Sequence, residues 1–288
     1  MKTVAIINQK GGSGKTTTAV CLAAALAESG WRVLVVDLDA QASATSWFGV
    51  RDDDNRLLEV LGSEGRLEDM VVSTGVPGVD LAPASHALSG IDRALATEVG
   101  AELILRRCLD ALPSGRYDLV LLDCPPALGL LSISALAACD EVLVPVEAHV
   151  MALSGLASLT HTLDRVRSRL NPAARLSAIL ACRVDARKNL CLDVVASLRE
   201  RFSDQVMKTV VRENVRLAEA PSFAAPITVY DSKSVGAEDY RAVATELLER
   251  FGCRRVKSGR VRGATSKRAP RTASQAHAKS KRPAEVSR

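Results

Sequence analysis

The stretch that decides the fold of this 288-residue chain reads Lys10-Gly11-Gly12-Ser13-Gly14-Lys15-Thr16-Thr17. It follows an apolar, β-branched run at residues 3–8 and precedes an alanine- and leucine-rich run at residues 15–29. A strand, a glycine-rich loop and a helix in this order are the required context for a phosphate-binding loop. Glycines let backbone N–H groups converge on phosphate oxygens, and the N-terminus of the helix favours an anion. The stretch therefore predicts a nucleotide-binding site.

Two side chains of the loop have direct chemical roles in such a site. Lys15 can reach the β- and γ-phosphates, and the Thr16 hydroxyl can ligate Mg²⁺. The loop also departs from the common pattern, because Gln9 stands where glycine is usual and a second cation, Lys10, precedes the glycines. A second lysine so close to phosphates needs an anion of its own. The alternative, a glycine-rich turn with a solvated lysine, leaves the flanking strand and helix unexplained.

The loop resembles that of the deviant Walker ATPases, and specifically that of the ParA family, which segregates bacterial chromosomes and plasmids. Further segments match the family in its order. Residues 37–41 read Asp-Leu-Asp-Ala-Gln and resemble a switch segment in which proline is usual at Ala40. Residues 119–126 resemble the Walker B strand and second switch, and residues 215–222 and 230–237 resemble two segments near the family's C-terminus. The resemblance covers residues 3 to about 250.

The resemblance implies an ATPase that uses ATP and Mg²⁺ and forms a homodimer when ATP binds. It implies that Lys10 reaches the partner's nucleotide and that Asp39 positions the attacking water, so that Lys10, Lys15 and Asp39 are the predicted catalytic residues. Thr16 is the predicted Mg²⁺ ligand, and Asp123 and Asp39 are expected to support the metal through water. The predicted nucleotide-binding residues are Lys10, Gly11, Gly12, Ser13, Gly14, Lys15, Thr16, Thr17 and Asn214.

The family's segment Pro-Arg-Asn is altered here to Arg212-Glu213-Asn214. Asn214 fits the position that contacts adenine in relatives. The family's arginine at this place helps to bind DNA, whereas Glu213 repels phosphate, so either Arg212 substitutes for it or the DNA contact lies elsewhere. The predicted DNA-binding residues are Arg212, Arg216, Lys233, Arg254, Arg255 and Lys257.

The composition indicates one α/β domain whose core is built from small aliphatic residues. Hydrophobic residues make up 47% of the chain and aromatic residues only 3%. No apolar run reaches the roughly 18 residues that span a bilayer, and the chain runs directly into its first strand without a signal peptide. Seven scattered cysteines without a Cys-x-x-Cys pair indicate a reduced cytoplasmic protein, and four histidines without metal spacing indicate ordinary packing.

Strands and helices are expected to alternate, which predicts a doubly wound, mostly parallel sheet with helices on both faces. We expect strands at 3–8, 32–37, 78–82, 117–123, 140–146, 176–183 and 205–211, and helices at 15–29, 85–112, 150–170, 187–202 and 234–251. The segments 8–16 and 123–126 then fall at the carboxyl ends of strands, where open α/β sheets bind ligands. Residues 49–77 show no clear pattern, and Asp52-Asp53-Asp54 is expected to be a solvated loop or helix cap.

The chain divides into an expected ATPase domain at 1–252 and a basic tail at 253–288. The tail holds 12 basic residues and one acidic residue, a formal charge of +11, whereas the rest holds 26 basic and 32 acidic residues, or −6. The tail is expected to be disordered and to bind nucleic-acid phosphates, although a solubilising extension is the alternative. It lacks the apolar face of a membrane-binding helix, so no membrane partner is expected.

These observations favour a partitioning ATPase that binds DNA without sequence preference, is associated with the nucleoid, and hydrolyses ATP slowly until a ParB-type centromere-binding partner stimulates it. A second hypothesis keeps the ATPase but changes its cargo to a chemoreceptor array, a carboxysome or the flagellar machinery. A third is an ATP-coupled iron–sulfur or electron-transfer protein, against which the lack of paired cysteines argues. A fourth, a binding module without hydrolysis, conflicts with Lys10, Lys15, Asp39 and Asp123 occurring together.

Overall fold

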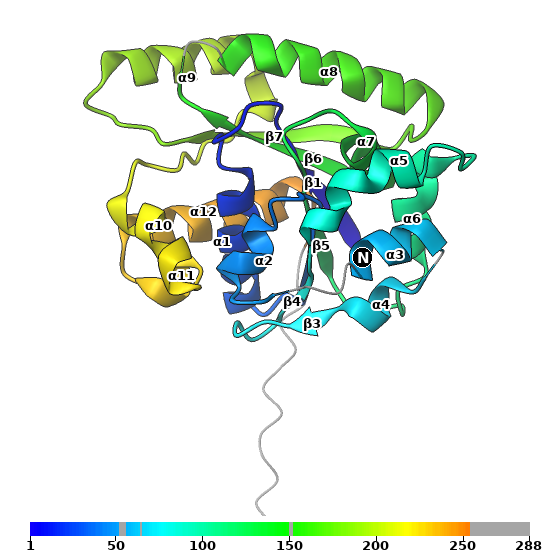
Figure 1. The fold of residues 1–288 in the computed structure, drawn as a ribbon. Coiled ribbons are helices and arrows are strands. Elements are labelled where there is room, and N and C mark those ends of the chain that lie inside the picture. The colour runs from blue at the N-terminus through cyan, green and yellow to red at the C-terminus, as the bar shows by residue number, and fades with distance from the viewer. Residues whose placement is uncertain (52–55, 64, 150–151, 254–288) are drawn as a thin grey trace, which may run out of the picture. The chain divides into compact units, whose positions relative to one another are not determined.

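The computed structural model describes residues 1–51, 56–63, 65–149 and 152–253. Within them seven strands form one sheet in the order β3-β4-β2-β5-β1-β6-β7 (Figure 1). The strands are β1 (Lys2–Ile6), β2 (Val33–Asp37), β3 (Val72–Ser73), β4 (Val79–Ala82), β5 (Leu119–Asp123), β6 (Glu141–Glu147) and β7 (Arg175–Cys182). All neighbours are parallel except β3 and β4. The predicted doubly wound, mostly parallel sheet is therefore confirmed.

The central strands are buried on both faces, as a parallel sheet requires. In β1, Val4 and Ile6 face one hydrophobic core, and Ala5 faces the other. Because successive side chains of a strand point to opposite faces, the two cores are separated by the sheet.

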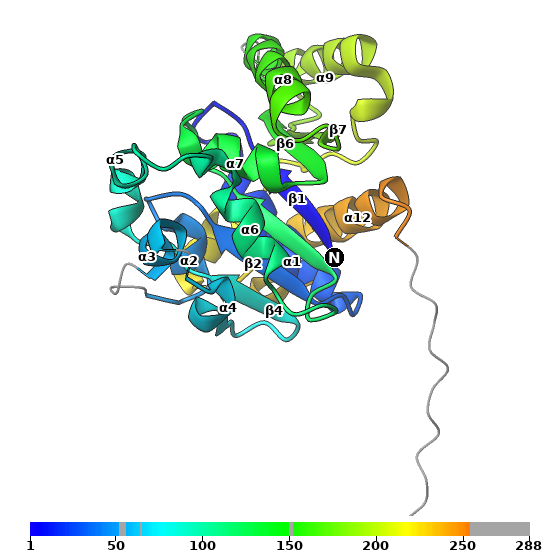
Figure 2. The same ribbon diagram turned by 90° about the vertical axis from the view of Figure 1, so that its right-hand side faces the viewer.

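Helices cover each face. The face of Val4 packs against α1 (Lys15–Glu28), α2 (Ser43–Trp47), α11 (Ile227–Tyr230) and α12 (Val235–Arg250), and α1 contacts α12 directly. The face of Ala5 packs against α3 (Arg56–Ser63), α4 (Leu67–Met70), α5 (Ile91–Ala94), α6 (Ile104–Asp110), α7 (Leu130–Ala138), α8 (Ala152–Arg169) and α9 (Asn189–Phe202). Both Figure 1 and Figure 2 show α8 and α9 beside each other over the β6–β7 end of the sheet. α10 (Val215–Glu219) and the 3₁₀ turn η4 (Ala220–Phe223) lead into α11.

The prediction of one continuous helix at 85–112 is wrong. The segment is divided into the 3₁₀ turn η1 (His86–Gly90), α5, the 3₁₀ turn η2 (Ala101–Leu103) and α6. Gly100 precedes η2 with a φ of 75°, a left-handed conformation that interrupts a helix and that glycine adopts without strain. The other four expected helices are present within a few residues of their predicted ends.

The expected strand at 205–211 is also wrong. It begins within the 3₁₀ turn η3 (Ser203–Gln205) and meets β7 through one isolated bridge, between Ile179 and Val206, and through backbone hydrogen bonds from Met207 and Val211. Side chains of α12 hold this segment instead, because Glu246 accepts the N–H groups of Lys208 and Thr209 at 2.9 Å each. The carboxylate of Glu246 thus binds backbone N–H groups that a neighbouring strand would bind in a regular sheet.

The segment without a clear pattern contains β3, which adds an antiparallel edge to the sheet. Asp52, Asp53 and Asp54 lie outside the described residues, as does the tail beyond Cys253 with Arg254, Arg255 and Lys257. No helix among the described residues is long and apolar enough to cross a membrane.

Candidate nucleotide site

The glycine-rich loop connects β1 to α1 at the carboxyl end of the sheet. Gly12 and Gly14 have φ values of 73° and 92°, which side chains with a Cβ rarely adopt. A Cβ at Gly11 or Gly12 meets nothing within 4 Å, so this backbone borders open space. The loop therefore leaves space beside its backbone, as a phosphate cradle needs.

Lys15 is buried at the first turn of α1, with 7% of its surface exposed. Its Nζ donates a hydrogen bond to the carbonyl oxygen of Lys10 at 3.3 Å, so the side chain folds back over the loop. Burial lowers the pKa of Lys15, while the carboxylates of Asp123 and Asp39 act in the opposite direction. A partly desolvated cation attracts a phosphate more strongly than a hydrated one does.

Asp123 ends β5 and is completely buried. Neither carboxylate oxygen has a hydrogen-bond partner in the described part of the chain. Burial raises the pKa of Asp123 well above its usual range, and the neighbouring Asp37 raises it further; Thr16, close by but outside hydrogen-bond geometry, and Lys15 lower it. A buried carboxylate without a partner is costly, so this group fits a site that a cation completes.

Asp37 is a buried residue of this site to which the sequence assigned no role. It ends β2 in register with Asp123 on β5, so the two carboxylates lie on neighbouring strands. Its oxygens accept the N–H and hydroxyl of Thr45 at 2.9 and 2.8 Å and the N–H of Asp39 at 3.2 Å. Burial raises the pKa of Asp37 to about 6. Asp37 thus ties the loop of Asp39 and the start of α2 to the sheet.

Asp39 is half-buried between β2 and α2 and lines the cavity described next. Its Oδ1 accepts the N–H of Gln41 at 3.0 Å, which fixes the turn. The proximity of a threonine hydroxyl on α1 and carboxylates on β2 and β5 gives an oxygen-rich set of the kind that Mg²⁺ prefers.

A cavity of about 670 Å³ adjoins the loop. One wall is the loop with the start of α1, and the opposite wall is the segment 211–218. Of the predicted site residues, the cavity is lined by Gly11, Gly12, Gly14, Lys15, Thr16, Thr17, Asp39, Arg212 and Asn214. Its size and its glycine and lysine border suit a nucleotide, and Thr16 with Asp123 suits the accompanying Mg²⁺.

Ser13 is part of the loop but does not line the cavity; it is buried, with 1% exposed. Its hydroxyl has no hydrogen-bond partner among the described residues. Asn214 borders the opposite wall and caps α10, because its Oδ1 accepts the N–H of Leu217 at 3.2 Å. This leaves the amide nitrogen of Asn214 for another partner.

Lys10 lies apart from the cavity lining and forms an ion pair with Glu147, at the end of β6, with 2.9 Å between Nζ and Oε2. The other oxygen of Glu147 faces Arg183, which follows β7, at 3.1 Å. Lys10 is the main cause, and Arg183 a smaller one, of a lowered pKa for Glu147. No sequence pattern pointed to Glu147 or Arg183, because their contacts join positions more than 30 residues apart.

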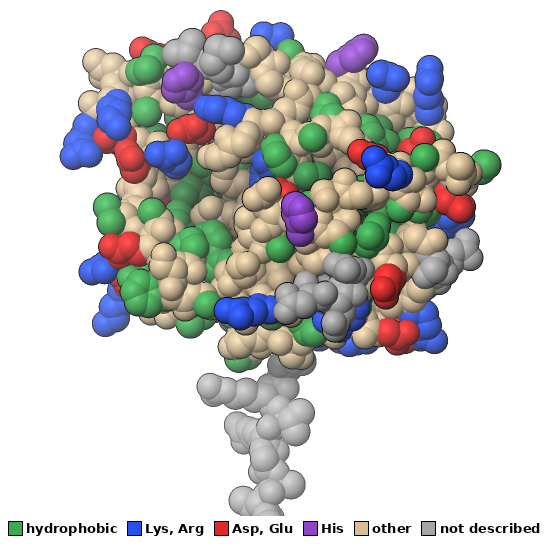
Figure 3. Space-filling view, viewed as in Figure 1, with side chains coloured by type: hydrophobic (Ala, Val, Ile, Leu, Met, Phe, Trp, Pro, Cys, Tyr) green, Lys and Arg blue, Asp and Glu red, His purple; other side chains and the backbone are tan. Residues whose placement is uncertain are grey.

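The three described residues predicted to bind DNA differ in their surroundings. Arg212 pairs with the buried Asp239 through its Nε at 2.9 Å, and Arg216 pairs with Glu219 at 3.1 Å. Lys233 is exposed and forms no ion pair with the described part of the chain. On the face in Figure 3, basic side chains stand beside acidic ones and do not form a separate patch. The assignment of these residues to DNA remains a prediction.

The seven cysteines are free, and six of them are buried. Cys182 lies under the loop, where its Sγ is 3.7 Å from the place of a Cβ on Gly14. Among the described residues no group of three or more histidine, cysteine or acidic side chains could hold a metal ion in the manner of a cluster site.

Comparison with known proteins gives both a family match and relatives that extend over most of the chain. A family model described as an AAA domain matches residues 1–176. The sporulation initiation inhibitor protein Soj of Bacillus subtilis is 42% identical over 248 residues, which are 85% of this chain and 98% of that protein. The chromosome-partitioning ATPase Soj of Thermus thermophilus is 47% identical over 250 residues, which are 87% of this chain and 96% of that protein.

A solved structure supports the same fold. The crystal structure of cobyrinic acid a,c-diamide synthase from Mycobacterium smegmatis, with a bound ATP analogue and magnesium, is similar with a TM-score of 0.77 and 32% identity. The match covers 88% of this chain and 96% of that chain.

Proposed function

We propose that this chain hydrolyses ATP as a nucleotide switch in the segregation of a chromosome or plasmid. The reason is that the chain belongs to the ParA family of chromosome-partitioning ATPases. ATP and Mg²⁺ are the ligands of this fold, as the bound ATP analogue and magnesium of a structural relative illustrate. The observation that carries the proposal is the cavity of about 670 Å³ between the glycine loop and segment 211–218, at the carboxyl ends of parallel strands.

Within this cavity the residues divide the work of phosphoryl transfer, which consists mostly of positioning and neutralisation of charge. The loop N–H groups and Lys15 would hold the phosphates, Thr16 would ligate Mg²⁺ with Asp123 supporting it through water, and Asp39 would orient the attacking water. Bound Mg²⁺ supplies charge neutralisation on the phosphate oxygens. Asn214 lines the opposite wall, and we assign it the contact with the base.

We assign Lys10 a role in a second protomer's site. It lies outside the lining of its own cavity, with 44% of its side chain exposed, and its partner Glu147 also pairs with Arg183, which lines the cavity. A cation supplied by a second copy makes hydrolysis depend on dimerisation, as an arginine finger does. The ATP-bound dimer then binds DNA without sequence preference, and hydrolysis stimulated by a ParB-type partner releases it.

The choice of cargo rests on the relatives. Both Soj proteins are similar over nearly their whole length, and one is named for chromosome partitioning. An ATPase that positions another cargo would use the same nucleotide switch. The identity of the protein that stimulates hydrolysis therefore distinguishes chromosome or plasmid segregation from the positioning of another cargo.

The first test is Lys10→Ala, with Lys2→Ala as the matched control because Lys2 also pairs with a glutamate at 2.9 Å. We expect the Lys10 variant to bind ATP normally but to lose ATP-dependent dimerisation and hydrolysis, measured by sedimentation and phosphate release. Normal dimers with full turnover would contradict the assignment.

A second test concerns the DNA output. Binding of the full chain and of residues 1–252 to a DNA fragment is measured with ATP, ADP or no nucleotide across a salt series. We expect binding that requires ATP and falls steeply with salt, because each phosphate contact releases counterions. Equal affinity and salt slope for the truncated protein would remove the tail from the mechanism, and binding that ignores the nucleotide would contradict the switch.

A further inference from the structure

Glu147 stands between two cations and gives one oxygen to each. Lys10 Nζ lies 2.9 Å from Oε2, and Arg183 Nη1 lies 3.1 Å from Oε1. The carboxylate is three-quarters buried, with 25% of its side chain exposed. The two cations therefore share one partly desolvated partner.

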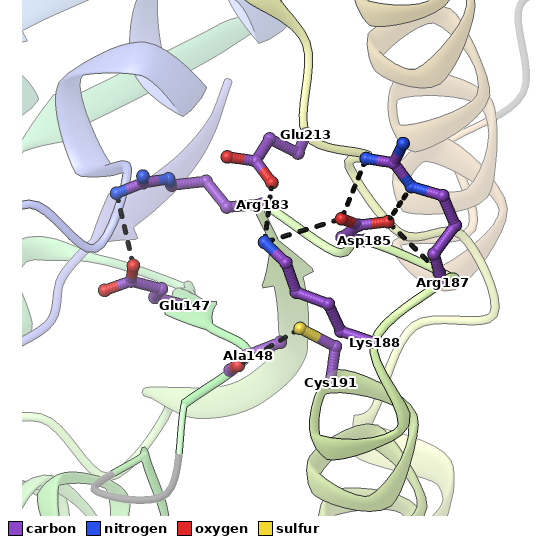
Figure 4. A network of polar contacts seen from close by, with 8 residues as sticks. All are labelled: Glu147, Ala148, Arg183, Asp185, Arg187, Lys188, Cys191 and Glu213. Atoms are coloured by element: carbon purple, nitrogen blue, oxygen red, sulfur yellow. Dashed lines mark hydrogen bonds and ion pairs between the residues drawn. The ribbon is translucent and has the colours of Figure 1, made fainter.

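Arg183 is set apart from the other charges that follow β7. Figure 4 shows it directed toward Glu147 and away from the group formed by Asp185, Arg187 and Lys188. Asp185 accepts from Arg187 at 2.9 Å, and Glu213 pairs with Lys188 at 3.4 Å, so these acids are already engaged. Among the described residues Glu147 is the ion-pair partner that the structure gives Arg183.

The backbone at Arg183 holds this arrangement in place. Its φ is 54°, a left-handed conformation that a residue with a Cβ adopts only when its surroundings impose it. The preceding Cys182 lies under Gly14, and Arg183 itself lines the nucleotide cavity. The strained residue thus sits where β7 meets the phosphate loop, and its side chain crosses to the end of β6.

The proposed function requires Lys10 to leave Glu147 for a second protomer. If Lys10 were the only partner of Glu147, its departure would leave a partly buried carboxylate unpaired, which opposes the move. Arg183 changes this balance, because Glu147 keeps one cation after Lys10 has left. Arg183 also repels Lys10 as a like charge.

We propose that Glu147 and Arg183 are positioning residues for Lys10: Glu147 holds the lysine in the monomer, and Arg183 loosens that hold so that Lys10 can enter a second protomer's site. The inference rests on the proposed role of Lys10 in dimerisation. It makes Arg183 a determinant of how readily the dimer forms.

The test is a double-mutant cycle on dimerisation, measured by sedimentation with a poorly hydrolysed ATP analogue and Mg²⁺. Arg183→Ala should weaken the dimer about three- to tenfold, because two such ion pairs change per dimer. Glu147→Gln should strengthen the dimer by a similar factor, since Lys10 is then free. In the Glu147→Gln background, Arg183→Ala should have a much smaller effect, limited to its direct repulsion of Lys10, which is the signature of coupling. Arg183→Lys should restore most of the wild-type value.

Matched controls come from the same elements. Arg187→Ala removes an arginine of the same loop that pairs with Asp185, and Glu141→Gln removes a glutamate at the start of β6 that pairs with Lys2. Both should leave dimerisation unchanged, and circular dichroism should show that every variant is folded.

The outcomes separate the two levels of the hypothesis. If Lys10→Ala dimerises normally, the proposed role of Lys10 fails. If Lys10→Ala abolishes the dimer but the effects of Glu147→Gln and Arg183→Ala simply add, only the positioning role fails. A loss of ATP-analogue affinity in monomeric Arg183→Ala, measured by fluorescence titration in the Lys10→Ala background, would also overturn it, because Arg183 would then contact the nucleotide directly.

Discussion

The carboxylates at the base of the nucleotide site differ from those at its rim. Asp123, at the base, is completely buried and its oxygens have no hydrogen-bond partner among the described residues. The rim consists of the ion pairs that the lining residues Arg183 and Arg212 make: Glu147 is bound by Arg183 and Lys10, and Asp239 by Arg212. The base therefore stores an unfavourable charge that a cation relieves, whereas the carboxylates of the rim are already paired with cations and have to exchange partners before they can act.

Removal of the charge at the base tests this contrast most severely. Asp123→Asn should lower ATP hydrolysis about 10²-fold or more, because support of Mg²⁺ is removed. The same change should stabilise the ligand-free protein by about 1–3 kcal/mol, because a buried charge without a partner is eliminated. Phosphate release and urea unfolding in EDTA measure the two effects.

Asp118→Asn is the matched control for that variant, since Asp118 precedes the same strand and pairs with Arg32 at the surface. It should change neither quantity by much. Lower stability in ligand-free Asp123→Asn would show that the carboxylate has a partner in solution, and the contrast between base and rim would fail.

The pH dependence of stability should have opposite signs at the base and at the rim. The folded pKa of Asp37 is about 6, above the ordinary value of 3.8, so the native state binds the proton more tightly than the unfolded state. Stability from this group is greatest below its unfolded pKa and is lost as the pH rises through about 6. Between pH 4.5 and 7.5 the expected loss is about 2 kcal/mol in ligand-free protein.

Urea unfolding in EDTA at these two pH values measures the loss, and Asp37→Asn should remove the part that comes from Asp37, leaving any part that comes from Asp123. Glu147 should act in the opposite direction, because its lowered pKa gives stability that is lost as the pH falls. Glu147→Gln therefore should make the fall of stability with rising pH steeper. An unchanged pH profile in Asp37→Asn would show that Asp37 does not titrate in this range.

The base of the site could be predicted from the sequence because each of its motifs is short and local. The glycine loop, Lys15 and Thr16 lie within eight residues, and Asp123 ends an obvious apolar strand. Their order along the chain also places them at one edge of a parallel sheet. Asp37 was visible beside Asp39, but its role depends on the register between β2 and β5, which sequence spacing does not fix.

The rim could not be predicted because its contacts join distant segments. Glu147 and Lys10 are separated by 137 positions, and Arg212 and Asp239 by 27. The strand expected at 205–211 failed for a related reason: its β-branched residues fit a strand, but Glu246 and Arg250 on α12 bind backbone groups there. Tertiary contacts by side chains outweigh local propensity in such segments.

Arg212 provides the last and smallest test, because the same residue has two competing interpretations. The sequence assigned it to DNA, whereas in the structure its backbone N–H and side chain both bind Asp239, of which only 5% is exposed. Arg212→Ala should destabilise the protein by about 1–2 kcal/mol, since a buried carboxylate loses its charged partner. Arg216→Ala, at a more exposed pair with Glu219, should change stability by less than about 0.5 kcal/mol.

Urea unfolding measures both variants, and a DNA-binding salt series separates the two interpretations of Arg212. A residue that holds Asp239 lowers stability when it is removed but leaves the salt slope of DNA binding unchanged. Removal of a residue that binds phosphate instead reduces that slope by about one unit for each phosphate left without its cation. Because the Asp239 carboxylate already engages Arg212, we expect Arg212→Ala to lower stability and to leave the salt slope unchanged. A reduced slope with unchanged stability would show instead that Arg212 can leave Asp239 for a DNA phosphate without loss of stability.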